Sequence, residues 1–206
     1  MVGYVIREGI AGDHLVARDA YRLEAVHGEV EHAEFAAARR VALRARGFAA
    51  ADDRLDAMRR RGTVLALRFG GAIVGGISCW RLSEAGCSLP HLLAGGAVGS
   101  CSDDRVVEVG SLFVSPEHAG RGLSHRLLQA QGLALATIDA ALVIAFAVTS
   151  EAGRFARQWG FRRAGVEAPH PNSPAIRVVP MVARAPEVVA KAVATAPGAV
   201  SFGERP

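Results

Sequence analysis

The stretch from Val106 to Ser124, VVEVGSLFVSPEHAGRGLS, decides the fold of this chain. Its first half is an apolar run typical of a buried strand, and the run ends at Ser115-Pro116. A tight loop with two glycines follows, and a helix is expected to begin near Leu123. A loop that leads into a helix presents unpaired backbone N–H groups and the positive end of the helix dipole. The stretch therefore predicts a strand, an anion-binding loop and a helix, although a glycine-containing connection without a ligand has the same pattern.

The residues on either side of this stretch predict alternating strands and helices. Gly70-Gly71 is a hairpin signal between two strands. Residues 82–104 are glycine- and serine-rich, and their length indicates a loop that is functional or mobile. We expect strands at 4–7, 63–69, 72–80, 105–114, 141–148, 161–166 and 175–183, and helices at 13–26, 29–46, 122–138, 150–159 and 186–195, with a short helix capped by Asp52. This order predicts an α/β fold with a mixed sheet that contains a strand–helix–strand crossover.

Length and composition indicate one domain. The chain has 206 residues, of which 50% are hydrophobic and 21% charged, which is enough for a full core. We expect a single domain over residues 1–183 and an Ala- and Pro-rich tail over residues 184–206. The longest apolar run, Ala140 to Val148, is too short to span a bilayer, and no signal-peptide pattern stands at the N-terminus. We therefore expect a cytoplasmic protein without a membrane partner.

The charge balance and the cysteine spacing limit the kinds of ligand and partner that we expect. Lys and Arg total 24 against 20 Asp and Glu, and Lys191 is the only lysine. Aromatic residues make up only 6% and no recognition motif appears, so nucleic acid is not an expected partner, whereas a small phosphate-bearing ligand suits the basic balance. Cys79, Cys87 and Cys101 lack metal-ligand spacing, so we expect reduced thiols and no metal.

Two motifs in register resemble the GCN5-related N-acetyltransferases (GNAT). The family's loop pattern, Q/R-x-x-G-x-G/A, falls on Ala119 to Ser124; Gly122 is kept, while the first and last positions depart from it. Downstream, Trp159-Gly160-Phe161 matches the family's helix-end signature. The resemblance covers roughly residues 63 to 182. It implies a GNAT-like mixed central sheet with a splayed parallel strand pair and helices on both faces.

The resemblance also implies how a co-substrate sits. Acetyl-CoA, or another acyl-CoA, would place its pantetheine arm against the strand and its pyrophosphate on the loop. Thr149 stands where the family often has an asparagine, and it either bonds the pantetheine or merely ends its strand. The implied contacts are Leu112, Phe113 and Val114 for the arm, and Ala119, Gly120, Arg121, Gly122, Leu123 and Ser124 for the pyrophosphate.

Acyl transfer to an amine needs a base, a polarised thioester carbonyl and a proton for the leaving thiolate. Glu108 lies in the apolar strand, and many relatives carry a glutamate here that acts as the base, usually through water. The alternative is a solvent-facing or salt-bridged strand residue. The family's usual acid, a tyrosine, is replaced by Ala156. Ser124 is our substitute candidate, with His125, a water and the 82–104 loop as alternatives.

A fainter similarity points to the acyl-homoserine-lactone and N-acyl amino acid synthases. This similarity rests on Tyr21-Arg22-Leu23, on Asp53 and Asp56, and on Glu108 with an aromatic residue shortly after it. These enzymes share the fold and take acyl chains from carrier proteins. Their E-x-S-R-F signature is not met, since Gly110-Ser111-Leu112 stands there.

The sequence thus predicts an acyltransferase that moves an acetyl or short acyl group from CoA to the amine of a small molecule. One alternative is a non-catalytic acyl-CoA sensor, which Ala119 and Ala156 indicate. Another is an enzyme of the same fold with other thioester chemistry, either carrier-protein-dependent N-acylation or decarboxylation. An acyl-carrier protein and a second copy of the chain, forming a homodimer, stay open as partners.

Overall fold

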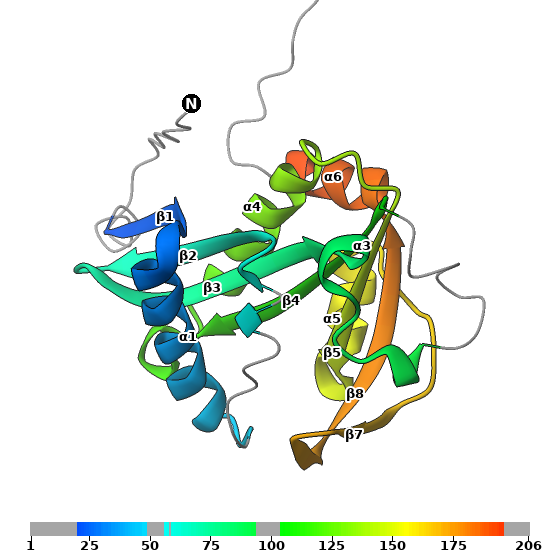
Figure 1. Ribbon diagram of the computed structural model, residues 1–206, viewed down its shortest axis with the longest axis horizontal. Coiled ribbons are helices and arrows are strands. Elements are labelled where there is room, and N and C mark those ends of the chain that lie inside the picture. Colours follow the sequence, from blue (N-terminus) through cyan, green and yellow to red (C-terminus); the bar gives the residue numbers. More distant parts are fainter. Residues whose placement is uncertain (1–19, 49–55, 58, 94–103, 196–206) are drawn as a thin grey trace, which may run out of the picture.

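A computed structural model describes residues 20–48, 56–57, 59–93 and 104–195 (Figure 1). The strands are β1 (Tyr21–Ala25), β2 (Thr63–Phe69), β3 (Ala72–Arg81), β4 (Val106–Val114), β5 (Leu142–Val148), β6 (Arg162–Arg163), β7 (Ala168–His170) and β8 (Ser173–Arg184). The helices are α1 (Gly28–Arg44), α3 (Leu82–Ala85), α4 (Leu123–Leu135), α5 (Thr149–Trp159) and α6 (Ala185–Ala194), with 3-10 turns at Pro90–Leu92 and Pro116–His118.

The strands form one mixed sheet in the order β1-β2-β3-β4-β5-β8-β6, with β7 on β8. Every pair is antiparallel except β4 and β5, which run parallel and are joined through α4. A parallel pair needs such a crossover, because the chain must return to the same edge before the second strand begins. The predicted mixed sheet with one crossover is confirmed.

The parallel pair opens like a V at one end. β4 and β5 pair from Val106 with Leu142 as far as Val109 with Ala145. Both strands then continue, and each keeps its outer neighbour: β4 stays on β3 up to Val114, and β5 stays on β8 up to Val148. The facing edges beyond Val109 and Ala145 are therefore free of the ladder between them, which is the splayed pair that the resemblance implies.

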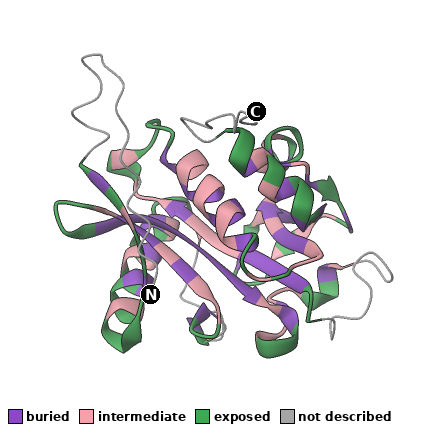
Figure 2. Ribbon diagram, turned by 90° about the horizontal axis from the view of Figure 1, so that it is seen from above, coloured by how far each residue is buried: buried purple, intermediate pink, exposed green. Residues whose placement is uncertain are grey.

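Helices cover both faces of the sheet (Figure 1). On one face α1 packs Phe35 and Ala42 against Val64, Ala66 and Phe113. On the other face α4, α5 and α6 meet the strand residues that alternate with these, and they form the largest core cluster. Strand alternation sends successive side chains to opposite faces, so an apolar strand such as β5 supplies both layers. Buried residues accordingly concentrate along the strands, between the exposed outer turns of the helices (Figure 2).

One expected helix is wrong in its described part. Residues 13–26 were expected to be helical, but Tyr21–Ala25 is strand β1, paired antiparallel with β2. Tyr21 and Leu23 alternate along the strand and reach the main core, so a period of two accounts for them better than a helical one. The expected strand at 4–7, and most of the short helix after Asp52, lie outside the described residues.

Three further boundaries differ from those expected. The segment assigned to one long loop contains α3 and the turn at Pro90–Leu92, while β7 is a strand that the Pro-rich composition of its region conceals. The segment assigned to the tail contains α6, and Ala185, Val188 and Ala192 of that helix belong to the main core. The remaining expected strands and helices are found within a few residues of their predicted bounds.

Candidate active site

A cleft of about 460 Å³ lies where β4 and β5 separate. Its floor comes from residues 108–112 of β4 and 145–148 of β5, so the V of the sheet and the cleft coincide. The walls come from the end of α1, residues 88–91, the inner face of α5 and residues 170–173. The apolar side chains that line the floor and walls include Leu43, Phe48, Leu89, Leu112, Leu128, Phe146, Phe155 and Val178.

Glu108 is the buried carboxylate in this cleft. Its residue is only 2% exposed, and it pairs with Trp80 of β3 on one side and Ile144 of β5 on the other. Ser88 engages both carboxylate oxygens: its backbone N–H donates to Oε2 at 2.8 Å, and its hydroxyl donates to Oε1. Of the two placements that the sequence left open, cleft or solvent, Glu108 has the first.

Burial raises the pKa of Glu108 to about 7, while the hydrogen bonds from Ser88, the Cys87 thiol and the charge of Arg59 act in the opposite direction. The dominant cause is desolvation, which disfavours the charged form of a carboxyl group. A carboxylate that titrates near neutral pH exchanges a proton readily at that pH, which suits a general base. The site can thus do proton transfer at the floor of the cleft.

Beside Glu108, strand β4 carries a bulge. Ser78 pairs with Gly110 and Gly76 with Phe113, so Ser111 and Leu112 together stand opposite a single residue of β3. Ser111 has φ +58°, which non-glycine residues rarely adopt, and its hydroxyl accepts a hydrogen bond from Arg59. Strained backbone of this kind is kept where the surroundings fix it, and it changes the direction in which the next backbone groups point.

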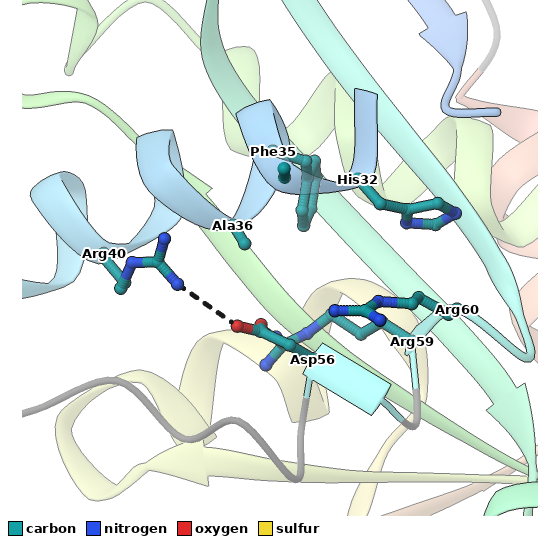
Figure 3. A pocket seen from close by; sticks show the side chains of 8 residues that line it. His32, Phe35, Ala36, Arg40, Asp56, Arg59 and Arg60 are labelled. Carbon is teal, nitrogen blue, oxygen red and sulfur yellow. Dashed lines mark hydrogen bonds and ion pairs between the residues drawn. The ribbon is translucent and has the colours of Figure 1, made fainter. Parts of the chain in front are cut away.

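Behind this bulge a buried ion cluster ties α1 to the segment before β2. Asp56 accepts ion pairs from Arg59, from Arg40 at 3.3 Å and from Arg39 at 3.9 Å. Figure 3 shows Arg40 reaching down from α1 to Asp56, with Arg59 beneath the helix. Arg40, Asp56 and Arg59 line a second cavity, of about 210 Å³, in which burial and the neighbouring Arg60 lower the pKa of His32. Arg59 also lines the main cleft, so the cluster supports the cleft from behind.

The predicted anion-binding loop has the expected form. Gly120 and Gly122 have φ near +75°, and a Cβ built on either would meet nothing within 4 Å. Gly122 caps α4 without any side-chain hydrogen bond, so the first backbone N–H groups of the helix keep their donor capacity. Ala119 and Arg121 are exposed, whereas Leu123 is buried in the core and Ser124 half-buried. The loop thus presents backbone donors and, at Arg121, a positive charge, while pyrophosphate binding by these residues stays a prediction.

An aromatic cluster holds this loop from the side. The Tyr21 hydroxyl and His118 Nδ1 are hydrogen-bonded at 2.7 Å, and the His118 ring packs against Phe69 with centroids 5.1 Å apart. His125 instead lies against Trp159 of α5, with centroids 5.2 Å apart. Both histidines that flank the loop therefore pack on aromatic rings, and neither lines the described cleft.

The predicted pantetheine contacts fall on the free edge of β4, and they differ in burial. Leu112 lines the cleft, Val114 is half-buried, and Phe113 packs into the core under α1 against Phe35. Phe113 therefore presents only backbone to that edge. Thr149 is the first residue of α5, and its hydroxyl oxygen is buried.

The expected acid positions do not converge on Glu108. Ala156 is exposed on α5, and Ser124 is not among the residues that line the described cleft. The face of α5 that reaches the cleft carries Phe155, Glu151 and Arg154, and the last two form an ion pair at 2.6 Å. Because helix neighbours lie three or four positions apart, the residue next to Ala156 faces inward while Ala156 does not.

Two features of the site were missed from the sequence. Ser88 lies 20 residues from Glu108 in a glycine- and serine-rich segment, and no local sequence pattern distinguishes it from the other serines there. Arg39 was not singled out in the sequence as a site residue; it is buried and lines the cleft together with Leu43, one turn further along α1. The spacing of these two residues on one helix face was the available signal.

Among the described residues no group of three potential metal ligands occurs, and none of the helices there is long and apolar enough to cross a membrane. Cys79 is a core thiol that accepts a hydrogen bond from Gln131, and burial raises its pKa to about 11. A thiol with that pKa is protonated at neutral pH and is not a nucleophile.

Comparisons with known proteins agree with this architecture. The model of the acetyltransferase (GNAT) family matches residues 37–131, and no curated protein matches the chain. Similar solved structures include FeeM, an N-acyl amino acid synthase from uncultured soil microbes, which is 13% identical with a TM-score of 0.71, covering 83% of this chain and 94% of that one. The acyl-homoserine-lactone synthase LasI is 13% identical with a TM-score of 0.59, covering 80% and 90%.

A third similar structure is a GNAT family acetyltransferase from Elizabethkingia anophelis with acetyl-CoA bound, which is 10% identical with a TM-score of 0.52, covering 81% of this chain and 99% of that one. At such identities the likeness concerns the fold, and it extends to both groups of proteins that the sequence resembles. The chain therefore has a GNAT-like fold, and its residues 37–131 match the model of the acetyltransferase (GNAT) family.

Proposed function

We propose that this protein transfers an acyl group from an acyl-CoA to the amine of a small molecule, with Glu108 as the general base. The observation that carries the proposal is the buried Glu108 carboxylate at the floor of the cleft between β4 and β5. The N-terminus of α4 also supports the proposal, because it follows two glycines and has no side-chain cap, so its backbone N–H groups can donate to a CoA pyrophosphate. Leu128 of the same helix lines the cleft.

In this reaction the amine nitrogen attacks the thioester carbonyl carbon. A C–N bond forms, the C–S bond breaks, and the thiolate leaves. Glu108, directly or through a water, accepts the proton that the amine loses, and the thiolate takes a proton from solvent. A CoA thiol has a pKa comparable to the 8.5 or so of a free cysteine, so leaving without an enzyme acid costs little near neutral pH. The absence of a tyrosine at Ala156 is compatible with turnover on this account.

The charge of the cleft favours an acceptor that also carries a carboxylate, such as an amino acid. Four arginines line the described cleft, namely Arg39, Arg46, Arg59 and Arg154, against the two carboxylates Glu108 and Glu151. A lining with excess positive charge repels polyamines and attracts anionic groups. The fold likeness to an N-acyl amino acid synthase supports the same acceptor class.

A second candidate is N-acylation with a longer chain delivered by an acyl-carrier protein. The apolar side chains that line the cleft, Phe48, Phe146 and Phe155 among them, favour it, because they suit an acyl chain longer than acetyl. Rates with acetyl-CoA, octanoyl-CoA and the corresponding octanoyl-carrier protein separate the two candidates. A preference for octanoyl-carrier protein would replace the short-chain CoA donor.

The test of the function is amine-dependent release of free thiol from acyl-CoA. Glu108→Gln should lower the rate by roughly 10²- to 10⁴-fold, the usual contribution of a general base, with CoA affinity unchanged. An unchanged rate at neutral pH would exclude Glu108 as the base. Binding of acyl-CoA without turnover across a broad set of amines would favour the sensor, and thiol release without any amine would favour other thioester chemistry.

The acceptor class has its own test. An amino acid is compared with its methyl ester, in the wild type and in Arg46→Ala. Loss of one charge-assisted contact should lower kcat/KM for the amino acid about tenfold and leave the ester unaffected. Arg44→Ala is the matched control, because Arg44, the last residue of α1 and two positions before Arg46, is an exposed arginine outside the cleft lining. Equal losses in both variants would remove the carboxylate requirement.

A further inference from the structure

One serine, far from Glu108 in sequence, donates a hydrogen bond to each oxygen of its carboxylate. The Ser88 N–H donates to Oε2 at 2.8 Å and the Ser88 hydroxyl donates to Oε1, so one residue binds both oxygens. We propose that Ser88 is a positioning residue that fixes the orientation of Glu108 and sets the pH at which this carboxylate accepts a proton. The inference rests on the proposed role of Glu108 as the base, and it gives the segment between β3 and β4 a function in the active site.

The segment that carries Ser88 is fastened on both sides of it. Before Ser88, the Trp80 indole N–H donates to the Gly86 carbonyl at 3.0 Å, and Cys87 is buried in a core cluster with Ile144. After Ser88, Leu92 is buried and Leu93 forms a strand-like bridge with Gly165. Ser88 is therefore held between two anchored points, which restricts how its donors can move relative to β4.

The chemistry of a hydroxyl suits a base that gains and loses a proton. A backbone N–H can only donate, so it favours the charged carboxylate. A hydroxyl donates to the carboxylate, and after a rotation it accepts from the protonated carboxylic acid. Ser88 can thus keep Glu108 hydrogen-bonded in both protonation states, which a buried titrating group requires if neither state is to carry an unsatisfied polar atom.

The other groups around Glu108 do not duplicate this role. Among the described residues, the Cys87 thiol and the Arg59 guanidinium are the further groups that act on its proton affinity, both in the same direction as Ser88. Its neighbours in the sheet, Trp80 on β3 and Ile144 on β5, do not titrate. A change confined to the Ser88 side chain leaves all four in place, so its effect can be attributed to the hydroxyl.

The experiment compares Ser88→Ala with the wild type in the pH profile of kcat/KM. The variant loses the hydroxyl and keeps the N–H, so the acid limb should move to higher pH by about one unit, with a rate about fivefold lower near neutral pH that recovers in alkali. Ser88→Thr keeps a hydroxyl and should restore the wild-type limb. Ser83→Ala is the matched control, because Ser83 is an exposed serine of α3 in the same segment.

A second readout does not depend on turnover. The infrared C=O band of protonated Glu108, assigned as the band that Glu108→Gln lacks, should titrate at higher pH in Ser88→Ala. If Ser88→Ala does not fold, Ser88→Cys keeps a weak donor and should shift the band less, in the same direction. An unmoved band, or a rate lowered equally at every pH, would overturn the role of Ser88 while Glu108→Gln stays inactive. An active Glu108→Gln would instead overturn the base itself.

Discussion

At the scale of single residues, Glu108 combines burial with a polar environment provided by one loop. A lone carboxylate in an apolar strand drew attention to it in the sequence, since charged residues are seldom fully buried, and the family resemblance supplied its expected role as a base. Its partner Ser88 could not be found in that way, because their contact exists only after the segment between β3 and β4 folds over the sheet.

The burial of Glu108 also predicts a pH dependence of stability. Its folded-state pKa is about 7, raised from an ordinary value of 4.5. The native state therefore binds the proton more tightly than the unfolded chain, so this contribution to stability is complete below the ordinary pKa and is lost as pH rises through the folded one. The titration of Glu108 contributes about 3 kcal/mol at most to the free energy of unfolding.

Glu108→Gln should remove this dependence. As the pH rises from about 5 to about 9, the free energy of unfolding of the variant should increase relative to that of the wild type, because the wild type must bury a charge at the higher pH. Urea unfolding of both proteins at the two pH values measures the difference. The same pH dependence in both proteins would show that the carboxyl group titrates normally in the fold.

At the scale of elements, the residues with a clear period were predicted well. Helix α1, the β2–β3 hairpin, β4, α4, β5 and α5 all follow from periodicity and from glycine signals at their ends. Strand β1 was missed because the apolar spacing of residues 13–26 in the sequence resembles that of a helix, and because its pairing with β2 is a long-range contact. The splay of β4 from β5 came from the resemblance and not from any local pattern.

The loop before α4 carries the prediction for CoA. Gly122→Glu introduces a side chain at φ +75° and a negative charge at the helix N-terminus, so CoA binding should be lost. Calorimetric titration with CoA measures this. Gly70→Glu is the control, because Gly70 has φ +57° and open space around it but lies in the β2–β3 hairpin. Equal CoA affinity in Gly122→Glu and the wild type would remove the loop from the binding site.

At the scale of the whole molecule, the C-terminal helix α6 completes the main core rather than forming part of a tail. It packs across α4 so closely that a Cβ at Gly132 would lie 2.6 Å from the Ala192 Cβ. Composition could not predict this, since an alanine-rich segment suits either a tail or a packed helix, and Pro186 stands in the first turn of α6, where a helix tolerates proline. The arginine content could not predict the burial of Arg39 and Arg59 either, because it depends on how α1 meets the sheet.

Close packing of α4 and α6 gives a testable cost. Gly132→Ala should destabilise the protein by about 1–3 kcal/mol, because α6 must move to admit the methyl group. Gly153→Ala on α5 meets only the flexible end of Arg157, at 3.4 Å. That control should instead stabilise by about 0.5–1 kcal/mol through helix propensity. Thermal and urea unfolding measure both, and a stabilised Gly132→Ala would show that α6 does not pack on α4 in this way.

The central claim is that the V between β4 and β5 holds an acyl thioester, with Glu108 beside it. A crystal structure of the protein with a non-hydrolysable acyl-CoA thioether tests it most directly. We expect the pyrophosphate on the backbone of Gly120 to Ser124. The ketone carbonyl of the analogue, which stands in for the thioester carbonyl, should lie in the cleft near Glu108 and the bulge at Ser111. Density for the acyl group on another surface, with the cleft empty, would contradict the account.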